Sequence, residues 1–221
     1  MRLSVVAGAG LAALALVAAT PATDWTKRVT QTPQGAFVLG NPAAKTRLVE
    51  YVSYTCDHCA HFSNEASAPL KSRYVANGST AVEVRHAVRD PIDLAATLLA
   101  RCTGPARFFA AHEKLFATQD QWFGQGVRYA QGNKDALEKA AGPERVRMLA
   151  KASGLGAVVG LNDAQVNACL ANTAQQRPVM AMTQEAWQTR SIPGTPHFLI
   201  NGESVKNATS WAALEPQLKT K

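Results

Sequence analysis

The sequence predicts an α/β fold in which a strand-rich part is interrupted by a long helical segment. Two observations support this prediction. Short apolar stretches bounded by Gly, Pro and Asn, which are typical of strands, lie within residues 36–86 and again at 197–200. Between them, from about residue 91 to residue 190, apolar side chains recur at three- and four-residue spacing, as in amphipathic helices. We therefore expect a helical subdomain inserted into an α/β domain.

The expected strands differ in how deeply they should be buried. Leu48–Val52 is nearly continuous in apolar residues, which is expected at the centre of a covered sheet. Asn201-Gly202 is a strong hairpin signal and predicts a return strand. The expected strands are residues 36–39, 48–52, 81–86, 197–200 and 203–206.

The first helix is expected to begin at residue 56, with a kink at Pro69 and an end at Asn77-Gly78. Gly154–Gly160 does not have the spacing of a nucleotide-binding loop, and we interpret it as a flexible connection between helices. Further helices are expected near residues 94–102, 108–116, 135–140, 144–153, 163–171 and 175–190, and from about residue 209 to the end.

Composition indicates a globular protein, because 47% of the 221 residues are apolar and only 18% are charged. The formal net charge is +7, but Lys and Arg are spread along the chain and mixed with Asp and Glu. Since the chain has no basic run interleaved with aromatic residues, we do not expect nucleic-acid binding.

Residues 1–22 have the pattern of a cleavable signal peptide. Arg2 supplies a positive charge, an apolar run follows to residue 19, and small residues there offer cleavage sites. The alternative is an uncleaved membrane anchor, although the run is short for a spanning helix. We expect export to the periplasm, with residues 23–34 as a short leader.

The most informative motif is Cys56-Asp57-His58-Cys59, which follows the apolar strand and begins a helix. Two cysteines at this spacing can form a disulfide and open it again, and the motif at a strand–helix junction is typical of a redox site. Unpaired N–H groups and the helix dipole at a helix N-terminus stabilise an anion, here the Cys56 thiolate. We expect Cys56 to be exposed and acidic, and Cys59 to be more buried.

Two further residues bear on this site. His58, if protonated, adds positive charge near the thiolate; alternatively it is an exposed side chain with little influence. Glu50 lies in the apolar strand, where a carboxylate is costly unless it has a partner or a raised pKa. The alternative for Glu50 is an exposed position on an edge strand.

A metal site is a competing interpretation of the motif. His58 and His61 could join the two cysteines as ligands, but neighbouring helix positions point in different directions, and a closed zinc site usually draws two pairs from separate segments. Covalent haem attachment needs His after the second Cys, where this chain has Ala60. We expect no metal and no cofactor.

The other two cysteines, Cys102 and Cys169, lie far from the motif in helical segments. In an oxidising compartment an even number of cysteines favours pairing, so we predict a structural disulfide between them. Two buried free thiols are the alternative.

Taken together, these residues resemble the DsbA-like branch of the thioredoxin superfamily over about residues 36–219. The resemblance rests on the cysteine motif, on the place and size of the helical insertion, and on Ile192-Pro193-Gly194-Thr195-Pro196 before the next strand. It implies a thioredoxin-like fold with an inserted helical subdomain. The implied division is residues 35–90 and 191–221 for the thioredoxin-like domain and 91–190 for the insertion.

The resemblance also implies roles for residues. The last proline of such a segment is cis in this family and faces the cysteines, which places Pro196 there, and Thr195 and Pro196 should present backbone to an extended substrate. Glu50 corresponds to a buried acid used in proton transfer. Cys102 and Cys169 resemble a second cysteine pair of some members. Asp57 is a departure, because the best-known oxidases have Pro there.

The function that we expect is an exported thiol–disulfide oxidoreductase that introduces disulfides into exported proteins at Cys56 and Cys59. The alternatives are a disulfide isomerase or reductase with the same site, and a thioredoxin-like chaperone or binding module. Expected partners are reduced or misoxidised exported proteins and, from the family, a membrane redox partner for recycling. The leader is too short for the dimerisation domain of known isomerases, so we expect a monomer.

Overall fold

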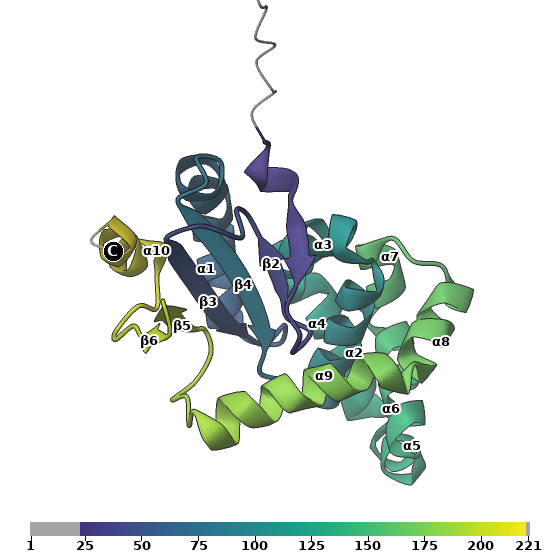
Figure 1. The fold of residues 1–221 in the computed structure, drawn as a ribbon. Helices are drawn as coiled ribbons and strands as arrows, with labels where there is room; N and C mark the ends of the chain where they lie inside the picture. Colours follow the sequence, from purple (N-terminus) through teal and green to yellow (C-terminus); the bar gives the residue numbers. More distant parts are fainter. Residues whose placement is uncertain (1–22, 220–221) are drawn as a thin grey trace, which may run out of the picture.

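The computed structural model describes residues 23–219, and the expected signal peptide at residues 1–22 lies outside them. The strand-rich part is a six-stranded sheet with the spatial order β1-β2-β4-β3-β5-β6 (Figure 1). Its strands are β1 (Val29–Gln31), β2 (Phe37–Leu39), β3 (Thr46–Val52), β4 (Thr80–His86), β5 (His197–Ile200) and β6 (Glu203–Ser204).

The most apolar strand lies inside the sheet. β3 runs parallel to β4 and antiparallel to β5, so strands flank it on both sides. All of its residues except Arg47 are buried, because side chains of both faces are covered. This explains why Leu48–Val52 is a nearly continuous apolar run rather than an alternating one.

Two helices that are far apart in the sequence pack on one face of the sheet. They are α1 (Asp57–Leu70) and α10 (Trp211–Lys219), which also contact each other. The Phe62 ring of α1 lies 4.5 Å from the Phe198 ring of β5. The opposite face holds a smaller apolar cluster under a π-helical turn, Glu185–Thr189, and it consists of Val49, Tyr51, Ala87, Ala186, Ile192 and Leu199.

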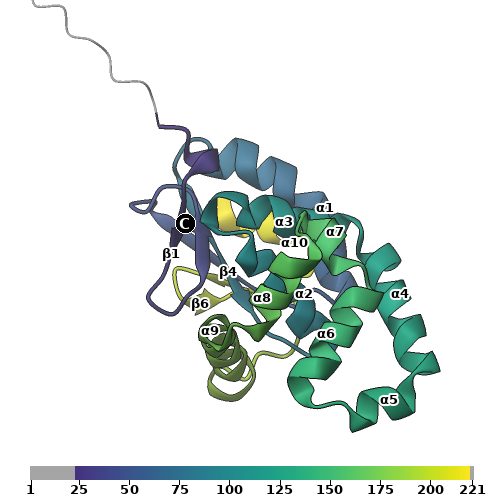
Figure 2. The ribbon, with the colours of Figure 1, turned by 90° about the vertical axis from the view of Figure 1, so that its right-hand side faces the viewer.

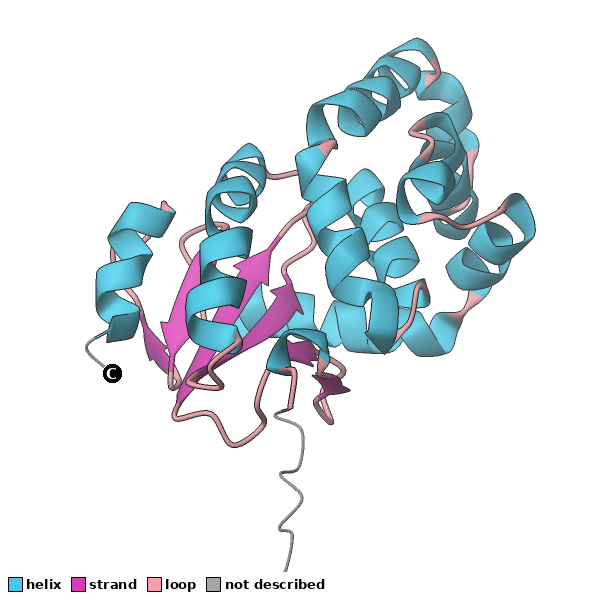
Figure 3. Cartoon of the chain, turned by 90° about the horizontal axis from the view of Figure 1, so that it is seen from above, coloured by secondary structure: helices cyan, strands magenta, loops and turns pink. Residues whose placement is uncertain are grey.

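The helical insertion lies beside the sheet as one body (Figures 1 and 3), and α9 leads from it across the ends of the strands toward β5. α2 is at its centre and packs against α3, α6, α7, α8 and α9, as the side view in Figure 2 shows for α2, α6 and α8. The helices are α2 (Pro91–Cys102), α3 (Pro105–Ala117), α4 (Gln119–Gly132), α5 (Lys134–Lys139), α6 (Gly142–Ala152), α7 (Leu155–Val159), α8 (Asp163–Ala171) and α9 (Thr173–Gln184).

The structure corrects the interpretation of Gly154–Gly160 as a flexible connection. The segment forms the short helix α7, with Gly154 and Gly160 in left-handed conformations at its two ends. Leu155 and Val159 are buried one helical turn apart, so packing fixes the turn. The glycines therefore end a helix rather than provide flexibility.

Three other elements differ in detail from the prediction. Part of the expected leader, Val29–Gln31, is strand β1 and pairs with β2. After Pro69 the helix continues as a π-helical turn, Lys71–Val75, before it ends near Asn77-Gly78. The return strand is only Glu203–Ser204, although the Asn201-Gly202 turn is present with positive φ at both residues.

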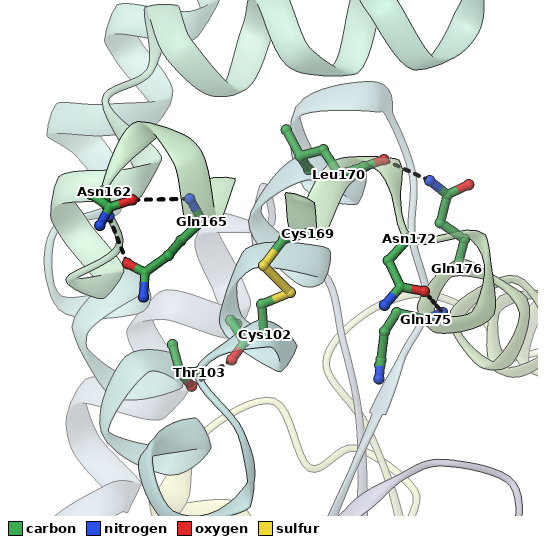
Figure 4. Close-up of a disulfide and its surroundings, with 10 residues drawn as sticks. Cys102, Thr103, Asn162, Gln165, Cys169, Leu170, Asn172, Gln175 and Gln176 are labelled. Atoms are coloured by element: carbon green, nitrogen blue, oxygen red, sulfur yellow. Dashed lines mark hydrogen bonds between the residues drawn. A yellow bond between two sulfur atoms is a disulfide. The ribbon is translucent and has the colours of Figure 1, made fainter. Parts of the chain in front are cut away.

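A disulfide joins the end of α2 to α8 in the structure (Figure 4), with Cys102 and Cys169 Cα atoms 6.0 Å apart. The two residues are 67 positions apart, and closing such a loop in the unfolded chain lowers its entropy by an amount worth about 4 kcal/mol. Asn162 caps the start of α8, the helix that carries Cys169, through a reciprocal pair of hydrogen bonds with Gln165.

One buried charge in the insertion leads to a stability prediction. Arg101 on α2 is 3% exposed, its guanidinium lies over the Phe37 ring, and its three side-chain nitrogens have no hydrogen-bond acceptor within residues 23–219. Burial lowers its pKa to about 10. Because an unpaired buried charge is costly, Arg101→Met should raise the free energy of unfolding by about 1–3 kcal/mol in denaturant titration. A loss of stability would contradict this account of Arg101.

Candidate active site

The cysteine motif lies where the central strand meets α1. β3 ends at Val52, and Ser53–Thr55 lead to Cys56, which occupies the N-cap position of α1. Cys59 is one turn inside the helix. Both cysteines are free thiols in this structure, so it describes the reduced site.

The thiol of Cys56 is strongly acidic. Its pKa falls from 9.0 to about 5, chiefly because the Cys59 thiol donates a hydrogen bond to it, with smaller contributions from Thr195, the Cys59 backbone and the charge of Arg89. Burial opposes this effect but is outweighed. At neutral pH Cys56 is therefore mostly a thiolate, the form that reacts with disulfides.

Cys59 has the opposite character. It is fully covered by its surroundings, and burial together with the neighbouring Cys56 raises its pKa well above the usual value. The two sulfurs thus differ in acidity as the spacing predicts. The prediction that Cys56 is exposed is wrong for this state, because the residue is only 2% exposed beneath the Thr195 carbonyl.

The loop before β5 lies directly against Cys56, although it is 139 residues away in the sequence. The Cys56 Sγ–Thr195 O distance is 3.1 Å, and in the protonated form the thiol is the donor. The contribution of Thr195 to the low pKa of Cys56 comes from its side chain rather than from this carbonyl. The Thr195–Pro196 peptide bond is cis. The structure thus brings together the two segments on which the resemblance rests.

Glu50 lies below the cysteines on β3, opposite Phe198 of β5 and Val84 of β4. It is 5% exposed, so the alternative of an exposed edge position does not hold. Its Oε1 has no hydrogen-bond partner within the described residues, and burial raises the pKa of its carboxyl from 4.5 to about 8. Glu50 and Cys59 interact electrostatically, so each resists ionisation of the other.

The polar residues between the cysteines point to solvent. Asp57 and His58 are exposed on the first turn of α1. The interactions that lower the Cys56 pKa come from Cys59, Thr195 and Arg89, so His58 is not placed among them. The His61 Nε2 lies 2.9 Å from the Glu65 carboxylate one turn further along α1, and the side chain is exposed like that of an ordinary surface residue of the helix.

Two residues at the site were not foreseen from the sequence. The buried Asp93 of α2 accepts hydrogen bonds from the backbone N–H of Tyr54 and of Arg89, at 2.8 and 3.0 Å. Gln119, the first residue of α4, donates to the carbonyls of Tyr54 and Cys56 at 2.7 and 2.9 Å. The segment before Cys56 is therefore held by side chains from outside the motif.

Comparison with known proteins agrees with this geometry. The family model described as Thioredoxin matches residues 32–220, which is nearly the whole chain after the expected signal peptide. The chain belongs to the thioredoxin family. Its α/β fold with inserted helices is accordingly that of thioredoxin-like proteins, and the predicted fold class is confirmed.

Two solved structures are similar to this thioredoxin-family chain. A crystal structure of a protein-disulfide isomerase from Novosphingobium aromaticivorans is 38% identical, covering 83% of this chain and 95% of that one, with a TM-score of 0.77. Wolbachia pipientis alpha-DsbA1 shares the fold at 19% identity, covering 86% of this chain and 92% of that one, with a TM-score of 0.67.

A putative protein-disulfide oxidoreductase of Rickettsia conorii is 27% identical over 85% of this chain and 61% of its own length. A similar protein of Rickettsia typhi is 27% identical over 77% of this chain and 56% of its own length. The thioredoxin-family chain thus spans about three fifths of the curated relatives that it matches. These comparisons confirm the resemblance to thioredoxin-like protein-disulfide oxidoreductases, and the likeness to alpha-DsbA1 is one of fold.

The described part of the chain has neither a metal-binding cluster nor a membrane-spanning helix. Residues 23–219 contain no group of three or more His, Cys, Asp or Glu side chains arranged to hold a metal ion. In the same part of the chain, each helix is too short or too polar to cross a lipid bilayer.

Proposed function

We propose that this protein is an exported thiol–disulfide oxidoreductase that introduces disulfides into exported proteins through Cys56 and Cys59. The observation that carries the proposal is the placement of the Cys56 thiol at the start of α1, where Cys59 and the Thr195 carbonyl contact it. The relatives named as protein-disulfide oxidoreductases support the same class of chemistry.

The acidity of Cys56 favours the oxidising direction. Ionisation stabilises the reduced enzyme, so a thiolate with a low pKa makes the disulfide form a stronger oxidant. A pKa of about 5 in place of 9.0 makes the reduced form roughly 100-fold more favourable at pH 7, or about 60 mV in potential. Asp57 is exposed at the helix start, where solvent weakens its opposing effect.

The reaction cycle begins with the Cys56–Cys59 disulfide. A substrate thiolate attacks the Cys56 sulfur, the S–S bond breaks, and Cys59 leaves as a thiolate that takes up a proton. A second substrate thiolate then attacks the substrate sulfur of the mixed disulfide and releases the Cys56 thiolate. The substrate loses two electrons and gains a disulfide, and the enzyme becomes a dithiol.

Glu50 and the loop before β5 are assigned supporting roles in this cycle. Because the pKa of Glu50 is about 8, its carboxyl holds a proton at neutral pH and can supply it toward Cys59 when that sulfur leaves. Thr195 and Pro196 offer backbone beside Cys56, where an extended substrate can add to the chain as a strand does.

A disulfide isomerase is the second candidate, because the solved structure that is 38% identical carries that name. An isomerase attacks substrate disulfides with the Cys56 thiolate, so it needs the reduced form to persist in an oxidising compartment.

We further propose that the protein is a periplasmic monomer. It acts on reduced or misoxidised exported proteins and is reoxidised by a membrane redox partner.

The redox potential of the Cys56–Cys59 pair tests the oxidase role. The protein is equilibrated in glutathione buffers, quenched by alkylation, and the peptide that carries Cys56 and Cys59 is quantified by mass spectrometry, so that Cys102 and Cys169 are not counted. The oxidase proposal predicts a potential well above that of thioredoxin, which is about −270 mV. A potential at or below that value would refute the oxidase role.

A further inference from the structure

The exposed side chain of Arg89 meets the active-site segment one residue before Cys56. Its Nη2 donates a short hydrogen bond to the Thr55 carbonyl, and its Nε donates to the Ser53 Oγ at 3.0 Å. Both acceptors belong to the buried connection between β3 and α1. A cation is therefore held one peptide unit from the reactive sulfur, while its other side faces solvent.

The backbone of Arg89 is held in place as firmly as its side chain. Asp93 accepts hydrogen bonds from the N–H of Arg89 and the N–H of Tyr54, which ties the connection after β4 to the connection after β3. The neighbouring Asp90 caps α2 and accepts a bond from the Thr55 Oγ1 at 2.6 Å. The guanidinium is thus directed to one place rather than free to move in solvent.

We propose that Arg89 is a positioning residue that stabilises the Cys56 thiolate and fixes the Ser53–Thr55 segment. Its guanidinium binds the negative end of the Thr55 carbonyl dipole and adds positive charge near Cys56. This role was expected of His58, which instead lies exposed on the helix. The proposal rests on the proposed function, since it concerns the same sulfur.

The other charges at this place work against Arg89. Asp90 lies on the same connection as Arg89, and Asp93 is in the first turn of α2. Asp57 follows Cys56 directly, and Glu50 interacts with Cys59. Burial raises the pKa of Asp93 to about 7, so this carboxyl titrates close to the pH range in which Cys56 titrates. The experiment must therefore observe the sulfur itself rather than total proton uptake.

The test is the pH titration of the Cys56 thiolate, followed by its ultraviolet absorbance and by the rate of alkylation, in the reduced protein. Arg89→Met removes the charge and both donors and should raise the Cys56 pKa by about 0.5–1 unit, a three- to tenfold change in the dissociation constant. Arg89→Lys keeps the charge and should restore part of the difference. Arg177→Met, which removes an exposed charge from α9, is the matched control and should leave the titration unchanged.

An unchanged Cys56 pKa in a cooperatively folded Arg89→Met variant would overturn the proposal, and a mere loss of stability would assign Arg89 a structural role only. If that variant does not fold, Arg89→Gln is decisive, since it is neutral but can still donate to the Thr55 carbonyl. The proposed function is tested by a different measurement, the redox potential of the wild-type protein. If that potential is reducing, the oxidase role fails, but the effect of Arg89 on the Cys56 pKa can still be measured.

Discussion

Replacing Cys56 with serine is expected to abolish disulfide formation in a reduced substrate, to below about 0.1% of the wild-type rate. A serine hydroxyl cannot form the mixed disulfide, and the acidic thiolate that reacts with substrate belongs to Cys56 rather than Cys59. The measurement is the recovery of activity by a reduced, unfolded enzyme whose native state requires disulfides, followed over time with catalytic amounts of the variant.

Two variants make this test specific. Cys59→Ser keeps the Cys56 thiolate but cannot form the Cys56–Cys59 disulfide, so it should not oxidise a reduced substrate. Given a substrate that already contains a disulfide, its Cys56 thiolate attacks one sulfur and the other leaves as a thiolate, so the mixed disulfide should accumulate because Cys59 is not there to displace it. The double variant Cys102→Ala, Cys169→Ala removes the disulfide between α2 and α8 and should keep the exchange reaction while losing stability. Unchanged substrate refolding by Cys56→Ser would show that the protein acts as a chaperone without thiol chemistry.

The second large effect is expected at Glu50. Its pKa is about 8 in the folded protein and 4.5 in the unfolded chain, so between these values the folded state binds more protons. Stability contributed by the protonated carboxyl is complete below pH 4.5 and is lost as the pH rises to 8. Glu50→Gln removes this loss and should stabilise the protein by about 3 kcal/mol at pH 7.

The measurement is the free energy of unfolding in denaturant at several pH values from 4 to 9. The difference between Glu50→Gln and wild type should be small near pH 4 and grow until about pH 8. Glu138→Gln, on the exposed surface of α5, is the control and should follow the wild-type curve. A difference that is independent of pH would mean that Glu50 is not a buried acid with a raised pKa.

The residues that carry the chemistry could be predicted because their types are unusual in their setting. Cys56 and Cys59 stand at a strand–helix junction, and Glu50 interrupts an apolar strand, so each is conspicuous without a structure. The burial of Glu50 followed from the same apolar run that marks β3 as an inner strand. Local pattern and spacing were enough for this part of the site.

The residues that hold the site could not be predicted in the same way. Asp93 and Gln119 are ordinary members of helical segments, and only folding brings them to the backbone before Cys56. Asp90-Pro91 does signal a helix start, with Asp as N-cap and Pro in the first turn, and this signal could have located α2. It could not have shown that Arg89 reaches Thr55, because side-chain contacts between connections depend on the tertiary arrangement.

Two short elements of the fold, β1 and α7, could not be predicted from the sequence either. β1 has only three residues and pairs at the edge of the sheet, so its sequence is hardly distinguishable from a polar leader. α7 is five residues long, and its glycines outweighed its two buried side chains in the sequence pattern. Short elements of this kind are stabilised by packing rather than by their own propensities.

The bonds from Gln119 have a consequence for the order in which the protein matures. Gln119 belongs to the insertion, yet it binds the carbonyls of Tyr54 and Cys56 at the junction of β3 and α1, which comes earlier in the chain. A chain emerging from its N-terminus presents both cysteines before α4 exists to hold them. The cysteine pair therefore reaches the geometry seen in the folded protein only after the insertion has folded and Gln119 is in place.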